Sequence, residues 1–224
     1  MKSFSSISNK IDSIVKHLPS LEHLPDEIPN KCPFCDGFGH IIDENGARPC
    51  TCVKKQVIQD EFREARIPRL YKNATLETFN PYRDSLKAQL NDLYNYVNHY
   101  SENNTKGIYI HGATGCGKTH LAIGVLKALL KKGYSGVFYN IVDLLDAIKD
   151  TYDLKNPTNT KSRLVQELKR QVFVLDDLGV QNSSNWVSER LYSIINNRYQ
   201  NCHTLIITSN LSLNDLMMKA DRTL

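Results

Sequence analysis

The stretch Gly112-Ala113-Thr114-Gly115-Cys116-Gly117-Lys118-Thr119 decides how this chain is interpreted, because it matches the pattern G-x-x-x-x-G-K-[ST]. A strand-like run, Ile108 to His111, precedes it, and a helical pattern starts at His120. Glycines let such a strand-to-helix turn curl so that backbone N–H groups point inward at phosphate oxygens. Lys118 then supplies positive charge to the β and γ phosphates, and the Thr119 hydroxyl can ligate Mg²⁺. The alternative is a glycine-rich turn with a chance lysine, which the flanking strand and helix make a poor explanation.

A second motif, Val172-Phe-Val-Leu-Asp176-Asp177, is an apolar strand that ends in two carboxylates. We expect Asp176 to hold Mg²⁺, through water, and Asp177 to orient or deprotonate the attacking water. Taken alone, a buried strand followed by a solvated turn explains this sequence equally well. Its position after the phosphate loop favours the catalytic interpretation.

A third strand-like run, Leu205-Ile-Ile-Thr-Ser-Asn210, ends in an amide. An asparagine in this place is by itself more often a turn residue. In this order of motifs we expect Asn210 to hold the attacking water near the γ-phosphate. The predicted ligand is Mg·ATP, and its expected contacts are Gly112, Ala113, Thr114, Gly115, Cys116, Gly117, Lys118, Thr119 and His120.

Strands and helices alternate through the second half of the chain. Strand-like runs lie at 107–111, 136–140, 172–175 and 204–208, with helical patterns near 118–132, 142–152, 161–170 and 186–200. Such alternation predicts βαβ units and a mostly parallel sheet. The expected fold class is α/β, a P-loop NTPase sheet flanked by helices and preceded by a small module.

Four segments organise the chain. Residues 1–30 are expected to form an amphipathic helix and linker, 31–54 a metal-binding module, 55–80 a connector with a polar helix at 54–65, and 81–224 the ATPase core. The helical stripe of the first segment consists of Ile7, Ile11, Ile14, Val15 and Leu18.

Four cysteines make up the module: Cys32 and Cys35 as C-x2-C, then Cys50 and Cys52 as C-x-C. Four thiolates satisfy tetrahedral Zn²⁺ and can fix a loop that has no apolar core. Disulfides or unliganded thiols are the alternatives, and His40 could replace one sulfur. A four-sulfur site has no open position, so we assign it a structural role.

The bulk composition is that of a globular protein, with 41% hydrophobic and 23% charged residues among 224 and a net charge of +4. This mildly basic balance permits contact with nucleic acid without establishing it. No run approaches the roughly 20 apolar residues of a membrane span, so we expect a cytoplasmic protein without membrane contact.

With these motifs in place, the chain resembles the bacterial replicative-helicase loaders of the DnaC/DnaI type, and behind them the IstB-like AAA+ ATPases. The resemblance rests on the Cys-Pro-x-Cys-x-Gly-x-Gly and Arg48-Pro-Cys-Thr-Cys series, on Ile67-Pro-Arg-Leu-Tyr, and on the phosphate loop. Leu175-Asp-Asp-Leu-Gly and Ile207-Thr-Ser-Asn complete it.

The resemblance implies that the N-terminal part grips a hexameric replicative DNA helicase. The AAA+ domain would bind ATP and single-stranded DNA, and would self-associate. An arginine finger would reach a neighbouring subunit from Arg222, with Arg198 as the alternative. Tyr71 lies where this family wraps the adenine base, although packing would explain it equally well. Relatives continue beyond Leu224 into a further strand and a sensor arginine, so the sequence is either truncated or naturally short.

Two other functions remain open at this stage. One is an IstB-like transposition helper ATPase, against which the cysteine module argues. The other is a nucleotide-binding zinc adaptor without significant hydrolysis. The shorter reach of Asp177, where many AAA+ proteins carry glutamate, is compatible with slow hydrolysis used as a switch.

Overall fold

A four-stranded parallel sheet forms the centre of the chain after Gln56, and its strand order places the candidate site. The computed structural model describes residues 32–43, 46–101, 106–152, 157–179 and 184–221. Its larger sheet has the order β3-β6-β5-β4, and each neighbouring pair is parallel. The four predicted strands are confirmed, and their C-terminal ends meet at one edge of the sheet. Their bounds are β3 Ile108–His111, β4 Gly136–Asn140, β5 Val172–Leu178 and β6 Thr204–Ser209.

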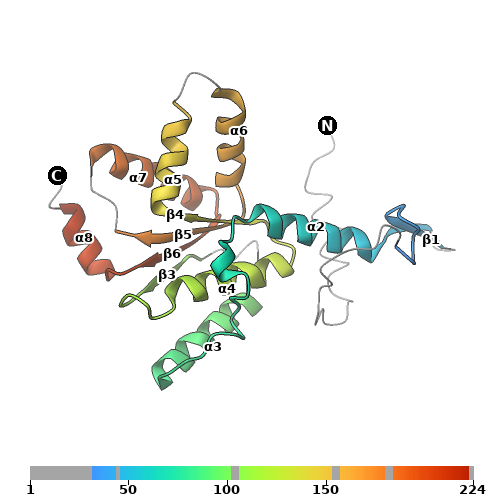
Figure 1. Ribbon diagram of the computed structural model, residues 1–224, viewed down its shortest axis with the longest axis horizontal. Helices are drawn as coiled ribbons and strands as arrows, with labels where there is room; N and C mark the ends of the chain where they lie inside the picture. The colour runs from blue at the N-terminus through green and yellow to red at the C-terminus, as the bar shows by residue number, and fades with distance from the viewer. Residues whose placement is uncertain (1–31, 44–45, 102–105, 153–156, 180–183, 222–224) are drawn as a thin grey trace. The chain divides into compact units, whose positions relative to one another are not determined.

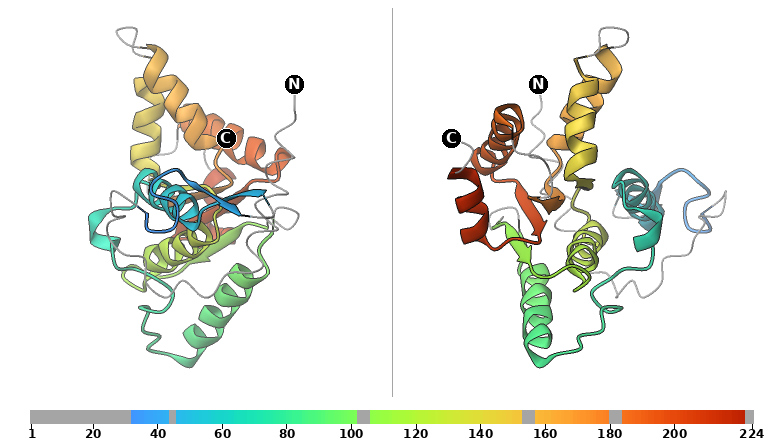
Figure 2. Two further views of the ribbon diagram at one scale, coloured as in Figure 1. Left: turned by 90° about the vertical axis from the view of Figure 1, so that its right-hand side faces the viewer. Right: turned by 60° about the vertical axis from the view of Figure 1, so that its left-hand side comes forward.

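The sheet is covered on both faces by helices, because successive side chains of a strand point to opposite faces. Val172 and Val174 of β5 belong to one apolar cluster, which α3 and α4 complete. Phe173 and Leu175 belong to a second cluster with α5, α6 and α7. Figures 1 and 2 show these two helical layers. The helices are α3 Asp84–Asn98, α4 Lys118–Lys131, α5 Ile141–Asp150, α6 Pro157–Leu168 and α7 Asn185–Gln200.

Helix α8, Leu213–Asp221, follows β6 and was not predicted from the sequence. Only one of its described apolar side chains, Leu216, packs against the second cluster, while Leu213 and Met217 are exposed. A helix with so few buried apolar positions leaves a weak periodic signal, which explains why sequence reasoning missed it.

The chain divides into two compact units, Met1–Gln56 and Val57–Leu224. Helix α2, Thr51–Glu64, begins in the first unit and ends in the second, three residues earlier at its start than predicted. In the second unit Ile58 is buried, and the carbonyl of Ala65 accepts a hydrogen bond from Phe138 of the edge strand β4. The predicted boundaries at 30, 54 and 80 stay predictions. The expected N-terminal amphipathic helix lies outside the described residues.

The first unit has almost no apolar interior. Its secondary structure before α2 is an antiparallel hairpin of β1, His40–Asp43, and β2, Gly46–Pro49. Its described buried residues are three cysteines, Cys32, Cys35 and Cys50, with Ile41 and Cys52 packed against them. Since so small a cluster buries little apolar surface, the unit needs another source of stability.

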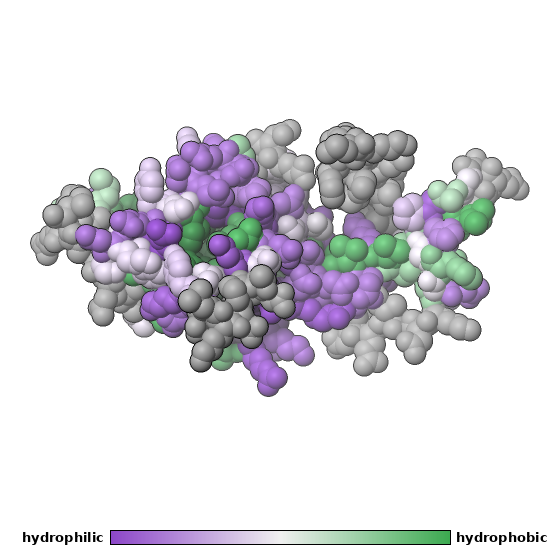
Figure 3. Space-filling model, turned by 90° about the horizontal axis from the view of Figure 1, so that it is seen from above, coloured by the Kyte–Doolittle hydropathy of each residue, from purple (hydrophilic) through white to green (hydrophobic). Residues whose placement is uncertain are grey.

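On the face that Figure 3 shows, the coloured residues are mostly hydrophilic, with hydrophobic side chains in separate groups. Among the described residues, no helix combines the length and the hydropathy that crossing a membrane requires.

Candidate functional site

The phosphate loop lies between the C-terminal end of β3 and the first turn of α4, as its motif predicts. Gly115 and Gly117 have φ angles of 79° and 92°, which side-chain-bearing residues rarely adopt. At Gly117 an added Cβ would also lie 2.5 Å from the ring of Phe79. Glycine is therefore required at Gly117 for two independent reasons, conformation and space.

Lys118 is the first residue of α4, and its side chain is nearly buried, with 6% exposed. Its Nζ donates to the carbonyl oxygens of Gly112 and Ala113, at 3.1 and 2.9 Å. The ammonium group is thus held across the opening of the loop by the loop's own backbone. A positive charge at this place, beside the N-terminus of a helix, fits a polyphosphate.

Thr119 and Asp176 meet although 57 residues separate them. The Thr119 hydroxyl lies 3.0 Å from Oδ1 and 3.2 Å from Oδ2 of Asp176. A hydroxyl and a carboxylate next to a phosphate site are oxygen donors of the kind that Mg²⁺ accepts, with water and phosphate completing its shell. The residues present therefore fit a Mg·ATP site.

Burial raises the pKa of Asp176, while hydrogen bonds from Thr208 and Thr119 act in the opposite direction. Asp177 follows it with a φ of 59° and is half-buried. Asn210 is exposed directly after β6, the strand that pairs with β5. The sheet thus brings the ends of the two strands together, whereas the catalytic roles of Asp177 and Asn210 stay predictions.

The structure adds Thr208, which sequence reasoning missed. Its hydroxyl is buried and bonded to Asp176, so it belongs to the same polar cluster. The sequence signal is slight, because Thr208 is simply a polar residue that follows the apolar run Leu205 to Ile207. Such a signal does not reveal which neighbouring strand the hydroxyl contacts.

His120, expected as a nucleotide contact, instead faces the connector in this structure. Its Nε2 lies 2.9 Å from the carbonyl oxygen of Thr75 and 3.2 Å from the Thr78 hydroxyl. Its ring also makes an edge contact with Phe79 at 5.6 Å between centroids. The connector is therefore fastened to the first turn of α4 beside the phosphate loop. A direct role of His120 in nucleotide binding stays a prediction.

The structure describes two of the three remaining candidate contacts, Arg198 and Tyr71. Arg222 lies outside the described residues. Arg198, the alternative arginine finger, is 1% exposed and donates to the carbonyls of Leu168, Arg170, Gln171 and Thr204. Because its guanidinium is used inside its own subunit, that interpretation of Arg198 is wrong. Tyr71 packs against the first apolar cluster, as the packing alternative holds.

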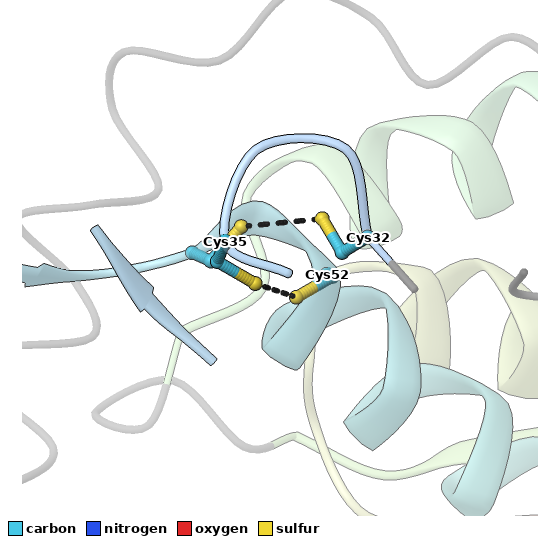
Figure 4. A group of neighbouring side chains, drawn as sticks. Cys32, Cys35 and Cys52 are labelled. Carbon is cyan, nitrogen blue, oxygen red and sulfur yellow. Dashed lines mark hydrogen bonds between the residues drawn. The ribbon is translucent and has the colours of Figure 1, made fainter. Parts of the chain in front are cut away.

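The four cysteine sulfurs of the first unit lie within 4.8 Å of one another. Figure 4 shows this group, with Cys32, Cys35 and Cys52 labelled. The Cys32–Cys50 and Cys35–Cys52 sulfur pairs are 3.7 and 3.4 Å apart, so neither is a disulfide, whose bond length is about 2.05 Å. Tetrahedral Zn²⁺ with bonds of about 2.3 Å places its sulfurs about 3.8 Å apart, close to these values.

Backbone groups stabilise two of the four sulfurs as thiolates. The N–H of Gly39 donates to the Cys35 sulfur at 3.3 Å, and a backbone hydrogen bond from Cys52 lowers the pKa of Cys50 to about 7. The hydrogen bond with the Cys35 sulfur and burial raise the pKa of Cys52, so the four sulfurs need a cation before all of them can be thiolates. Cys52 lies in the first turn of α2, which accounts for the short C-x-C spacing. His40 is exposed and its Nδ1 contacts the Phe38 carbonyl, away from the four sulfurs.

Comparison with known proteins points to one family. The family described as IstB-like ATP binding protein matches residues 10–221. The chain is 29% identical over 145 residues to the replicative helicase loader DnaC of Escherichia coli (strain K12). That match covers 63% of this chain and 57% of the relative, so the chain spans little more than half of its length.

Two further similarities extend over more of the chain or its structure. The replicative helicase loader DnaC of Buchnera aphidicola subsp. Baizongia pistaciae is 26% identical over 218 residues, covering 96% of this chain and 85% of that protein. A crystal structure of the DnaC helicase loader has a TM-score of 0.60 and 36% identity, covering 69% of this chain and 87% of that one. The predicted fold class, a P-loop sheet of the AAA+ type, is confirmed.

Proposed function

The chain belongs to the IstB-like ATP-binding protein family, and from this membership and its site geometry we propose that it is an ATP-dependent loader of a replicative helicase. The observation that carries the nucleotide part is the meeting of Thr119 and Asp176 beside Lys118. The loader part is supported by relatives named replicative helicase loader. The proposal implies a cytoplasmic protein, because a helicase loader works where the DNA is.

In the proposed mechanism the loop and Lys118 bind the triphosphate. The backbone N–H groups of the loop and the Lys118 ammonium compensate the phosphate charge, and they cost no reorganisation because the fold holds them in place. Thr119 and Asp176 would hold Mg²⁺, which would compensate part of the negative charge of the phosphates. Asp177 would orient or deprotonate the attacking water, and Asn210 would hold that water near the γ-phosphate.

The second part of the proposal concerns assembly. The cysteine module, with Zn²⁺ on Cys32, Cys35, Cys50 and Cys52, would contact the hexameric helicase together with the N-terminal segment. The ATPase unit would self-associate, with Arg222 reaching a neighbour's nucleotide, and would contact single-stranded DNA. ATP binding and hydrolysis would then switch the loader between holding and releasing the helicase.

Co-purification with the replicative helicase of the same organism tests this function, with and without Mg·ATP and with zinc measured in the same sample. We expect a zinc-containing complex whose amount changes with nucleotide. The Lys118→Ala variant should form a complex that no longer responds to ATP. The absence of any complex with the helicase would contradict the loader function.

Two outcomes would identify the alternatives. Retention of a transposase and duplex DNA, with no helicase, would indicate a transposition helper ATPase. A helicase complex together with ATP binding but no turnover, even with helicase and DNA added, would indicate a zinc adaptor that uses nucleotide structurally.

A further inference from the structure

The pairing between β5 and β6 is interrupted at the two aspartates. Leu175 pairs with Ile207, and the next pair is Leu178 with Ser209. Asp176 and Asp177 of β5 therefore stand opposite one residue of β6, Thr208. This is the arrangement of a β-bulge, which redirects side chains and removes ladder hydrogen bonds.

The bulge creates two local requirements at once. Asp177 has a φ of 59°, a left-handed conformation that non-glycine residues seldom adopt unless their surroundings enforce it. Asp176 is 4% exposed, so its carboxylate needs hydrogen-bond donors.

The Thr208 hydroxyl meets both requirements. It donates to Oδ1 of Asp176 at 2.6 Å and accepts from the backbone N–H of Asp177 at 2.9 Å. A hydroxyl has one proton to donate and lone pairs to accept with, so a single side chain can make both bonds. Thr208 is fully buried, so its hydroxyl is not exposed to solvent.

Resting on the proposed ATPase function, we propose that Thr208 is the positioning residue of this site, aligning the Asp176 carboxylate toward Thr119 and holding Asp177 in its left-handed backbone conformation. Thr119 contacts the same Asp176 carboxylate from α4. The Asp176 carboxylate is thus held from both α4 and β6, and Asp177 is held through its backbone N–H from β6. Asn210 follows β6 directly, two residues beyond Thr208, so the strand that leads to the proposed water-holding residue also holds Asp176 and the backbone of Asp177.

A purely structural role makes a different prediction. Valine has nearly the shape of threonine and suits a buried strand, so it would preserve packing while removing both hydrogen bonds. Serine keeps the hydroxyl and loses one methyl group. The pair Thr208→Val and Thr208→Ser therefore separates hydrogen bonding from packing.

The same strand offers a matched control. Thr204 is also fully buried, and its hydroxyl lies 2.8 Å from the hydroxyl of Tyr100, at the opposite end of β6. Thr204→Val removes a buried hydroxyl from the same strand without touching the acidic pair.

The first measurement is amide exchange of Asp177 in the nucleotide-free, full-length protein. In Thr208→Val the exchange should be faster by about tenfold or more, because the N–H loses its acceptor. Thr208→Ser and Thr204→Val should leave it within about threefold of the parent.

The second measurement is ATP affinity with Mg²⁺ and with EDTA, together with turnover. Thr208→Val should lose most of the Mg²⁺-dependent gain in affinity and about tenfold or more in turnover, while its affinity in EDTA stays within about threefold. Thr208→Ser should retain both properties.

Unchanged Asp177 exchange in Thr208→Val, or equal damage in Thr208→Ser, would overturn the inference. A parent protein that binds no ATP would instead contradict the proposed function. The Asp177 exchange would still decide whether Thr208 holds the acidic pair.

Discussion

The two units of this chain are stabilised in opposite ways. The second unit encloses a sheet between two apolar clusters, with α4 buried along most of its length. The first unit buries little besides cysteine sulfur. A core built from many contacts loses stability in steps, whereas a module built on one ion is folded or unfolded as a whole. Substitutions in the second unit should therefore lower its free energy of unfolding by graded amounts. Loss of the ion should unfold the first unit as a whole.

The largest expected effect is loss of the zinc module. Cys35→Ser, or treatment with a chelator, should release the zinc and unfold the first unit, since binding free energies of structural zinc reach about 10–16 kcal/mol in small domains. Metal analysis and amide exchange over residues 32–50 check this. The ATP affinity of Cys35→Ser, measured with Mg²⁺ present, should equal that of the parent protein.

Cys202→Ser is the matched control, because Cys202 is an exposed free thiol in the second unit. It should retain all the zinc. Equal loss of zinc in both variants, or a parent protein without zinc, would contradict the assignment of the site.

The next effect is a graded loss in the second unit. Arg198→Met should lower its free energy of unfolding by about 3–5 kcal/mol, because one buried and three partly buried carbonyls lose their charged donor. Denaturant unfolding of the full chain measures it. Arg63→Met, which removes an exposed ion pair with Asp60, should cost no more than about 1 kcal/mol. Equal losses of stability in the two variants would contradict the stabilising role of the hydrogen bonds from Arg198 to the four carbonyls.

Lys118→Ala is expected to disturb the fold least, and its effect should appear in ATP binding. Lys118→Ala should lower ATP affinity by about 100-fold, or about 2.7 kcal/mol, because the phosphates lose a charge-assisted partner. Equilibrium binding of ATP measures this. Lys131→Ala, an exposed lysine at the other end of α4, should bind ATP normally. Unchanged affinity in Lys118→Ala would refute the nucleotide site.

The sequence predicted the fold because the phosphate loop and the two polar strand ends are local patterns with a required order. It also predicted the cysteine cluster, since four sulfurs in a segment without other core residues leave few alternatives. Contacts that depend on strand register were not predictable. The bulge that pairs Thr208 with two aspartates arises from an interruption in the β5–β6 ladder, which no single segment encodes.

Arg198 illustrates a second limit. An arginine near the end of an amphipathic helix usually lies in solvent, and its sequence neighbours Asn197 and Tyr199 are indeed exposed. The carbonyls that bury Arg198 come from the end of α6, the residues just after it and the start of β6, and they converge only in three dimensions.

The most direct test of the central claim, an ATP-switched helicase loader, is a loading assay. It combines the organism's own replicative helicase with circular single-stranded DNA and measures the helicase retained on DNA, with or without this protein and Mg·ATP. The parent protein should raise helicase retention in an ATP-dependent manner, and Lys118→Ala should lose this ATP dependence. No increase with the parent protein, or the same ATP-dependent increase with Lys118→Ala, would contradict an ATP-switched loader function.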